Sequence, residues 1–182
     1  YKYKQSNYQR IYVQTAFSFT VNEDQIFERG AEIVSLIDRL QSYDIRCQVT
    51  AVYSVKSLEL TNEENEENIP TYNALIALKD YGGVASISTM AFALAHPSFL
   101  RRLIFAEAEN NEADIVKTMG FSKGHSYGET IPYTPPNPKE DLYIPSYQEG
   151  FDVETLRKAG DSIIEKHKIT HGITSHDTPS LW

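Results

Sequence analysis

The first third of the chain places one long helical pattern between two strand patterns, and this order restricts the fold more than any other feature. Residues 10–16 are rich in β-branched and aromatic side chains, which predicts a buried strand. Residues 45–55 alternate apolar with more polar side chains, as a half-buried strand does. A helix between two such strands is typical of a parallel sheet covered by helices.

The segment between these strands has a helix start signal and one apolar face. Asn22 can cap the first turn, and Gln25 stands three residues later, as in a capping box. Apolar or small residues then recur every three or four positions, the period of an amphipathic helix. These residues are Ile26, Gly30, Ile33, Ile37 and Leu40. Glycine inside a helix costs up to about 1 kcal/mol, so we expect Gly30 to lie close to a neighbouring strand.

The rest of the chain continues to alternate strand and helix patterns. Further strands are predicted at residues 72–79, 103–106 and 142–144. A continued helix is the alternative interpretation of residues 103–106. Further helices are predicted from Ser86 or Ser88 to His96, over residues 111–119 and over residues 152–167. Loops are predicted at residues 59–68 and 121–138.

This alternation predicts an α/β fold in three layers, with a mostly parallel central sheet and helices on both faces. A length of 182 residues is that of one ordinary domain. We divide the chain into a lead-in over residues 1–9, the α/β domain over residues 10–169 and a tail over residues 170–182.

Charge and composition exclude several classes of protein. The net charge of −8 repels phosphate backbones, so nucleic acid is an unfavourable partner. The single cysteine, Cys47, excludes a disulfide scaffold and is most simply a core residue. No apolar stretch approaches the roughly 20 residues of a membrane span, which favours a soluble intracellular protein. Because the chain starts at Tyr1 rather than Met, we expect a trimmed or partial product.

The loop after the first strand is where a site is expected, because ligands bind beyond the carboxyl ends of parallel strands. Residues 11–18 resemble the first strand and loop of the von Willebrand A domain, whose metal-site motif is Asp-x-Ser-x-Ser. Gln14 stands at the aspartate position, Ala16 at that of the first serine, and Ser18 matches the second serine. Magnesium needs hard oxygen ligands, usually carboxylates, so the resemblance implies a degenerate motif with no metal or other cofactor.

A second resemblance covers residues 10–173. It is carried by residues 28–33, 36–40 and 91–103, of which the His-Pro-Ser segment at residues 96–98 is the most specific. These segments are similar to an uncharacterised von Willebrand A-like family encoded by phages and mobile elements. The resemblance implies a von Willebrand A or Rossmann-like fold, a phage or mobile-element setting, and a place in the host cytoplasm or the virion. It implies no activity.

Our first functional hypothesis is a non-enzymatic module for protein interaction or assembly. Its contact surface is predicted to contain Gln14, Thr15 and Ser18, together with Glu107 and the loop over residues 121–138. Glu107 follows residues 103–106 and is the candidate replacement for an aspartate that the von Willebrand A family places there.

The second hypothesis is an enzyme or nucleic-acid-processing factor with an anion site. His96, Arg101 and Arg102 could together hold a phosphate, since two guanidiniums and an imidazole are suitable donors. The simpler interpretation is that His96 ends a helix and the arginines pair with surface acids. Histidines at 167, 171 and 176 have a spacing that could share a metal, although solvated tail histidines explain them equally simply. No phosphate-loop or nucleophile motif is present.

Overall fold

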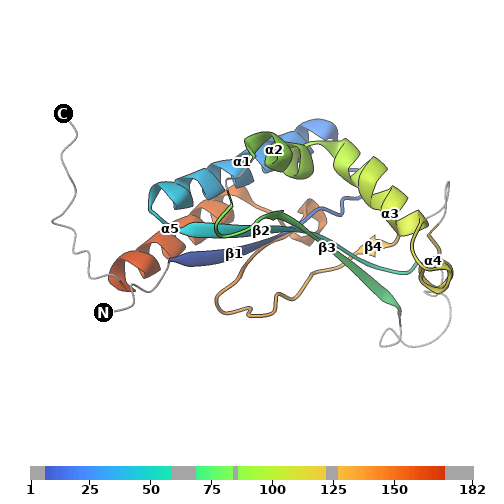
Figure 1. The fold of residues 1–182 in the computed structure, drawn as a ribbon. Coiled ribbons are helices and arrows are strands. Elements are labelled where there is room, and N and C mark those ends of the chain that lie inside the picture. The colour runs from blue at the N-terminus through green and yellow to red at the C-terminus, as the bar shows by residue number, and fades with distance from the viewer. Residues whose placement is uncertain (1–6, 59–68, 84–85, 122–126, 171–182) are drawn as a thin grey trace.

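The computed structural model describes residues 7–58, 69–83, 86–121 and 127–170 of the chain (Figure 1). Its strands are β1 (Tyr8–Gln14), β2 (Arg46–Lys56), β3 (Thr71–Lys79), β4 (Glu129–Thr130) and β5 (Leu142–Ile144). Its helices are α1 (Glu23–Ser42), α2 (Ile87–Ala95), α3 (Phe105–Glu109), α4 (Ala113–Met119) and α5 (Val153–Thr170), with a π-helical segment η2 (Phe99–Ile104) and a 3-10 turn η3 (Tyr147–Glu149). The predicted α/β class is confirmed.

The sheet is mixed rather than mostly parallel. Its strand order is β3-β2-β1-β5, with β4 also paired to β2. β1 runs parallel to both β2 and β5, as predicted, whereas β3 and β4 run antiparallel to β2. A parallel connection needs a crossover of a dozen or more residues, usually a helix. No described helix lies between β2 and β3 along the chain, and these two strands pair as antiparallel neighbours.

The predicted start and apolar face of α1 are confirmed. The Asn22 side chain accepts from the Gln25 amide at 2.8 Å, and the Gln25 side chain accepts from the Asn22 amide at 3.1 Å. All five predicted core positions of this helix are buried. The expected neighbour of Gly30 was wrong: a Cβ there would lie 2.6 Å from the Leu94 carbonyl oxygen. Gly30 therefore allows α1 to cross α2 closely, and the neighbour that requires the glycine is this helix rather than a strand.

The core lies on one face of the sheet. Odd-numbered residues of β1 and β2 point to this face, where one cluster joins Ile11 and Val13 to side chains of α1, α2 and α5. A second cluster joins Tyr53 and Val55 to side chains of η2, α3 and α4. Figure 1 shows α1 and α2 above the sheet and the loop before β5, in orange, below it.

The opposite face of β1 is covered by the segment over residues 131–141. The Tyr12 and Tyr133 rings lie 5.6 Å apart, and Arg10 Nε donates to Asp141 Oδ1 at 2.7 Å. Since the helices of the described residues join core clusters on the other face, the three-layer arrangement is not confirmed.

The strand predicted at residues 103–106 was wrong, and the alternative of a continued helix is correct. Residues 99–109 form η2 followed directly by α3. Leu100, Ile104 and Ala108 are buried at intervals of four residues, which is the period of a helix face. The remaining predicted helices and strands are confirmed, including the Ser86 cap of α2 and the extended His96 before Pro97. The loop predicted at residues 59–68 lies outside the described residues, and the loop predicted at residues 121–138 contains β4. No helix among the described residues is long and apolar enough to cross a membrane.

Candidate functional site

A cavity of about 910 Å³ opens beyond the carboxyl ends of β1 and β2. We call it the edge pocket. Its lining comes from the loop after β1, from η2 and α3, from the segment around β4, and from η3. The residues that line it include Phe17, Ser18, Phe19, Leu58, Leu100, Arg101, Phe105, Tyr127, Glu129 and Glu149. The pocket lies where parallel sheets commonly bind their ligands.

The wall of the edge pocket is built from aromatic packing. The Phe105 and Tyr127 rings are stacked with centroids 3.7 Å apart. The Tyr127 hydroxyl bonds to Glu109, and its backbone carbonyl accepts from the buried Tyr53 hydroxyl. Burial and the Glu109 bond raise the pKa of Tyr127 to about 12. At neutral pH this wall is therefore uncharged.

The charged groups of the pocket differ in how firmly they are held. The Glu149 carboxylate accepts from the Tyr143 hydroxyl at 2.8 Å and from the Ser146 amide at 2.9 Å. Glu129 pairs with Lys56 at 3.2 Å. Arg101 has only a 3.7 Å contact with Glu23, and both side chains are largely exposed. Exposed pairs of this kind contribute about 0–1 kcal/mol, so Arg101 is the charge most available to a ligand.

Gln14, predicted as a contact residue, is fully buried and joins distant segments of the chain. Its Oε1 accepts from the amides of Ala16 and Ser54, both at 3.2 Å. Its Nε2 donates to the Ile131 carbonyl at 2.9 Å and lies 3.3 Å from Glu149 Oε1. The residue at the motif's aspartate position thus bonds inside the protein, where a partner cannot reach it.

The other predicted contact residues separate in space. Thr15 is buried, and its hydroxyl donates to the Val52 carbonyl at 2.9 Å. Ser18 is half-buried and lines the edge pocket. Glu107 lies on α3, where it accepts from the Tyr72 hydroxyl at 2.8 Å. Of the four residues predicted, Ser18 alone belongs to the pocket.

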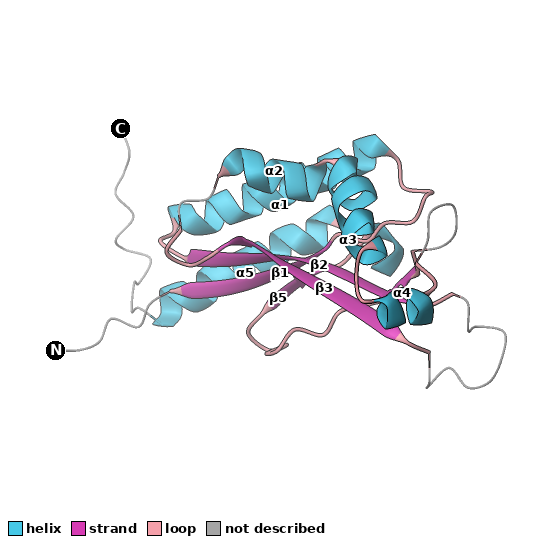
Figure 2. Cartoon of the chain, turned by 45° about the vertical axis from the view of Figure 1, so that its right-hand side comes forward, coloured by secondary structure: helices cyan, strands magenta, loops and turns pink. Residues whose placement is uncertain are grey.

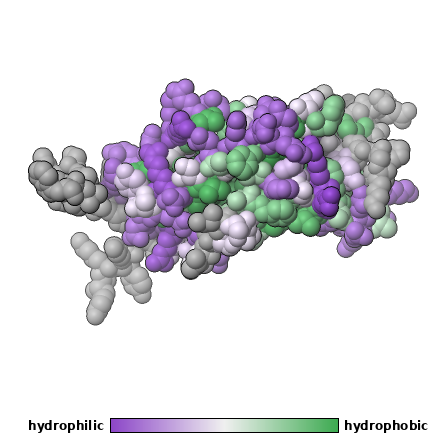
Figure 3. Space-filling model, turned by 90° about the horizontal axis from the view of Figure 1, so that it is seen from above, coloured by the Kyte–Doolittle hydropathy of each residue, from purple (hydrophilic) through white to green (hydrophobic). Residues whose placement is uncertain are grey.

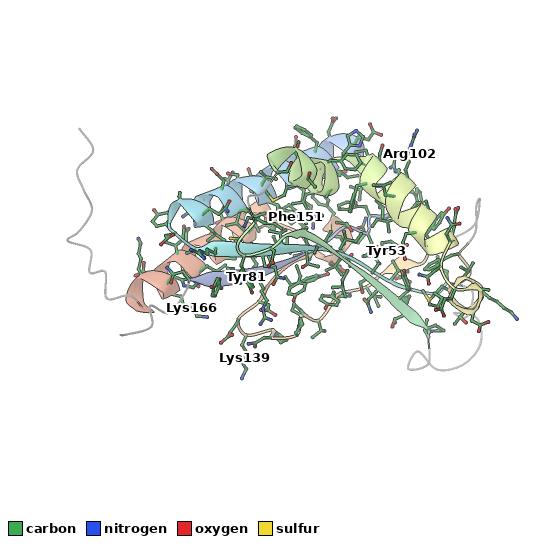
Figure 4. The ribbon with its side chains drawn as sticks, viewed as in Figure 1. Tyr53, Tyr81, Arg102, Lys139, Phe151 and Lys166 are labelled. Atoms are coloured by element: carbon green, nitrogen blue, oxygen red, sulfur yellow. The ribbon has the colours of Figure 1, made fainter. Side chains whose placement is uncertain are left out.

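The residues of the predicted anion site lie at the end of α2 and on η2. His96 Nδ1 accepts from the Ser98 amide at 3.1 Å, and Arg101 pairs with Glu23. Figure 4 shows Arg102 pointing away from the sheet. Within the described part of the chain, no group of three His, Cys, Asp or Glu residues could hold a metal, and residues 171 and 176 lie outside that part.

Comparison with known families finds one match. A family model described as "Domain of unknown function (DUF7192)" matches residues 2–171, which include every described helix and strand. The chain belongs to this family. Neither the curated proteins nor the solved structures contain a match. The comparisons show no link to the von Willebrand A domain or to phages.

This DUF7192 domain also buries an arginine beside the pocket. Arg29 is fully buried, and its Nη2 donates to the carbonyls of Gln14 at 2.9 Å and Pro145 at 2.7 Å. Its guanidinium lies 5.2 Å from the Phe17 ring centre and 5.0 Å from that of Phe151. Burial lowers its pKa to about 10. Arg29 thereby joins the carboxyl ends of β1 and β5 and supports the Phe17 wall.

A second hollow of the DUF7192 domain, of about 840 Å³, lies between α1 and α2. Phe27, Ala31 and Ala91 are among its apolar lining, and Phe27 is 64% exposed. Figure 3 looks down on this helical face and shows a hydrophobic band between hydrophilic side chains. Unlike the edge pocket, this groove has few polar groups that could orient a ligand.

Proposed function

We propose that this DUF7192 domain is a non-enzymatic protein-binding module, and that the edge pocket receives an apolar side chain of the partner. The observation that carries this proposal is Phe19, which lines the pocket and is 93% exposed; Leu58, which lines the same pocket, is 40% exposed. Exposed apolar side chains around a concave site are typical of binding surfaces. A buried anchor residue in such a pocket usually supplies most of the affinity of a protein interface.

The charges of the pocket suggest the residue that flanks the anchor. Glu129 and Glu149 are already held by partners within the domain, whereas Arg101 is only loosely paired. A partner carboxylate beside the anchor would therefore form a charge-assisted bond with Arg101. The preferred partner segment carries a large apolar residue close to one acidic residue.

The wider setting rests on the sequence resemblance alone. Its von Willebrand A-like relationship, its phage or mobile-element source and its location in the host cytoplasm or virion stay predictions. They would supply a context for an assembly module, and the geometry of the edge pocket does not depend on them.

A peptide-display selection against the whole domain tests the proposal. We expect enriched peptides to share an apolar residue next to an acidic one. In fluorescence anisotropy titrations, Phe19→Ala should reduce the affinity for such a peptide by about tenfold or more, and Arg101→Ala should reduce it less. Phe27→Ala is the matched control, because Phe27 is an exposed phenylalanine of the other groove. Equal losses for the two phenylalanine variants would contradict the proposal.

The anion-site hypothesis makes a different prediction in the same assay. A single-stranded oligonucleotide should then bind to the domain, and its affinity should fall steeply as salt rises. The binding should be lost when Arg101 and Arg102 are both replaced by alanine. That result, with no enriched peptide, would favour the nucleic-acid hypothesis over the protein-binding one.

A further inference from the structure

The strand β3 forms one edge of the sheet in the described part of the chain. Among the described strands it pairs with β2 alone, over Thr71–Lys79. Figure 2 shows it along the near edge of the sheet. Backbone groups of every second residue of such a strand point outward, and an exposed edge is a template for another strand.

This edge has little of the usual protection against pairing: the irregularity recorded in its pairing with β2 is a register shift at Leu78, close to the end of the strand. Natural edge strands carry charges, proline or bulges that prevent contact with other chains. Residues 71–78 contain no charged residue and no proline. None of them is fully buried: Tyr72, Ala74, Ile76 and Leu78 pack on the core but stay half-exposed, while the alternate residues are exposed. Leu75, at the centre of the strand, is 51% exposed.

We propose that β3 pairs antiparallel with β3 of a second copy of this chain, which joins the two sheets into one. Only one antiparallel register pairs all nine residues, and it places Leu75 opposite itself. Ala74 then faces Ile76 of the second copy, and Tyr72 faces its Leu78. Lys79, the one charged residue of the strand, faces Thr71, so no like charges meet.

The choice of a second copy follows from this self-complementarity. An isologous contact between identical strands closes as a two-fold dimer and leaves no free β3 edge. It also places the apolar side chains of each β3 beside those of the second copy, which reduces their exposure. The inference is independent of the edge pocket, since none of the pocket's residues belongs to β3.

Sedimentation over a range of concentrations tests the proposal. The wild-type chain should reach twice the 20.7 kDa mass of one chain. Leu75→Lys places two lysines opposite each other and should raise the dimer Kd by about tenfold or more. Leu103→Lys is the matched control, because Leu103 is similarly exposed at 54% but lies on η2. An equimolar mixture of Leu75→Lys and Leu75→Glu should recover the dimer mass.

A disulfide test fixes the register and does not depend on the lysine variant folding. Directly opposed residues in antiparallel strands have Cα atoms about 4.5–5.5 Å apart, which a disulfide can span. Leu75→Cys should therefore form a covalent dimer on mild oxidation, whereas Leu103→Cys should not. Cys47 is fully buried and does not interfere. A monomer at every concentration, a dimer unaffected by Leu75→Lys, or a mass that grows beyond two chains would overturn the proposal.

Discussion

Replacing Gln14 by alanine tests whether this residue holds the carboxyl end of β1 or is free to contact a ligand. The variant leaves the amides of Ala16 and Ser54 and the carbonyl of Ile131 without their bonds of 3.2, 3.2 and 2.9 Å. An unpaired buried group costs about 1–3 kcal/mol. Water can enter the space left behind, so the lower half of that range applies to each of the three groups and the expected loss is about 3–6 kcal/mol in all.

Urea denaturation followed by circular dichroism measures this loss. The midpoint should fall while the slope stays unchanged, because the surface exposed on unfolding hardly changes. For a domain of this length the melting temperature should drop by about 6–24 °C, taking about 2–4 °C per kcal/mol. Gln41→Ala, at an exposed position of α1, should change the stability by less than about 0.5 kcal/mol. A loss below about 1 kcal/mol for Gln14→Ala would refute the reasoning.

Three further predictions follow from the described contacts. Gly30→Ala should destabilise the domain by about 1–2 kcal/mol, because overpacking against α2 outweighs the gain in helix propensity, whereas Gly82→Ala, with nothing within 4 Å of its Cβ, should be neutral in the same urea assay. Burial raises the pKa of Cys47 to about 11, so the stability that the neutral thiol gives the folded state is complete below pH 9 and is lost towards pH 11. Over that range the free energy of unfolding of the wild type should fall by about 2 kcal/mol more than that of Cys47→Ala. An identical pH profile for the two proteins would contradict this. Magnesium or manganese should leave the melting temperature unchanged, because the Gln14 oxygen is already bonded within the protein; a saturable rise would show that the native state binds the ion.

Elements with local signals could be predicted from the sequence. The capping box of Asn22 and Gln25 and the apolar period of α1 are complete within one segment, and both are confirmed. The strand prediction for residues 103–106 was wrong for the opposite reason, since four apolar residues are too few to show a period. The signal lay in a longer window, where Leu100, Ile104 and Ala108 repeat at a helical spacing.

The roles of Gln14 and Arg29 depend on contacts that a local pattern does not contain. The partners of Gln14 lie up to 135 residues away in the chain, and those of Arg29 up to 116 residues away. One signal for Arg29 was present: it stands three residues after Ile26 and four before Ile33, on the apolar face of α1. A charged residue at such a position indicates a buried polar contact.

The edge pocket was predicted in part. Its place beyond the carboxyl end of β1 follows from the general rule for parallel sheets, and Ser18 was among the expected residues. The contributions of Leu100 and Glu149 were missed, because no helix was predicted over residues 99–102 and because Glu149 lies in a short turn. The antiparallel β3 was missed because alternation alone does not give strand direction.

Mapping a selected peptide onto the domain by amide NMR shifts tests the central claim most directly. The account predicts that the largest shifts on titration fall at edge-pocket residues such as Ser18, Leu100 and Tyr127 and that they disappear in Phe19→Ala. Largest shifts around Phe27 and Ala91, in the groove between α1 and α2, would contradict the claim that the edge pocket is the binding site.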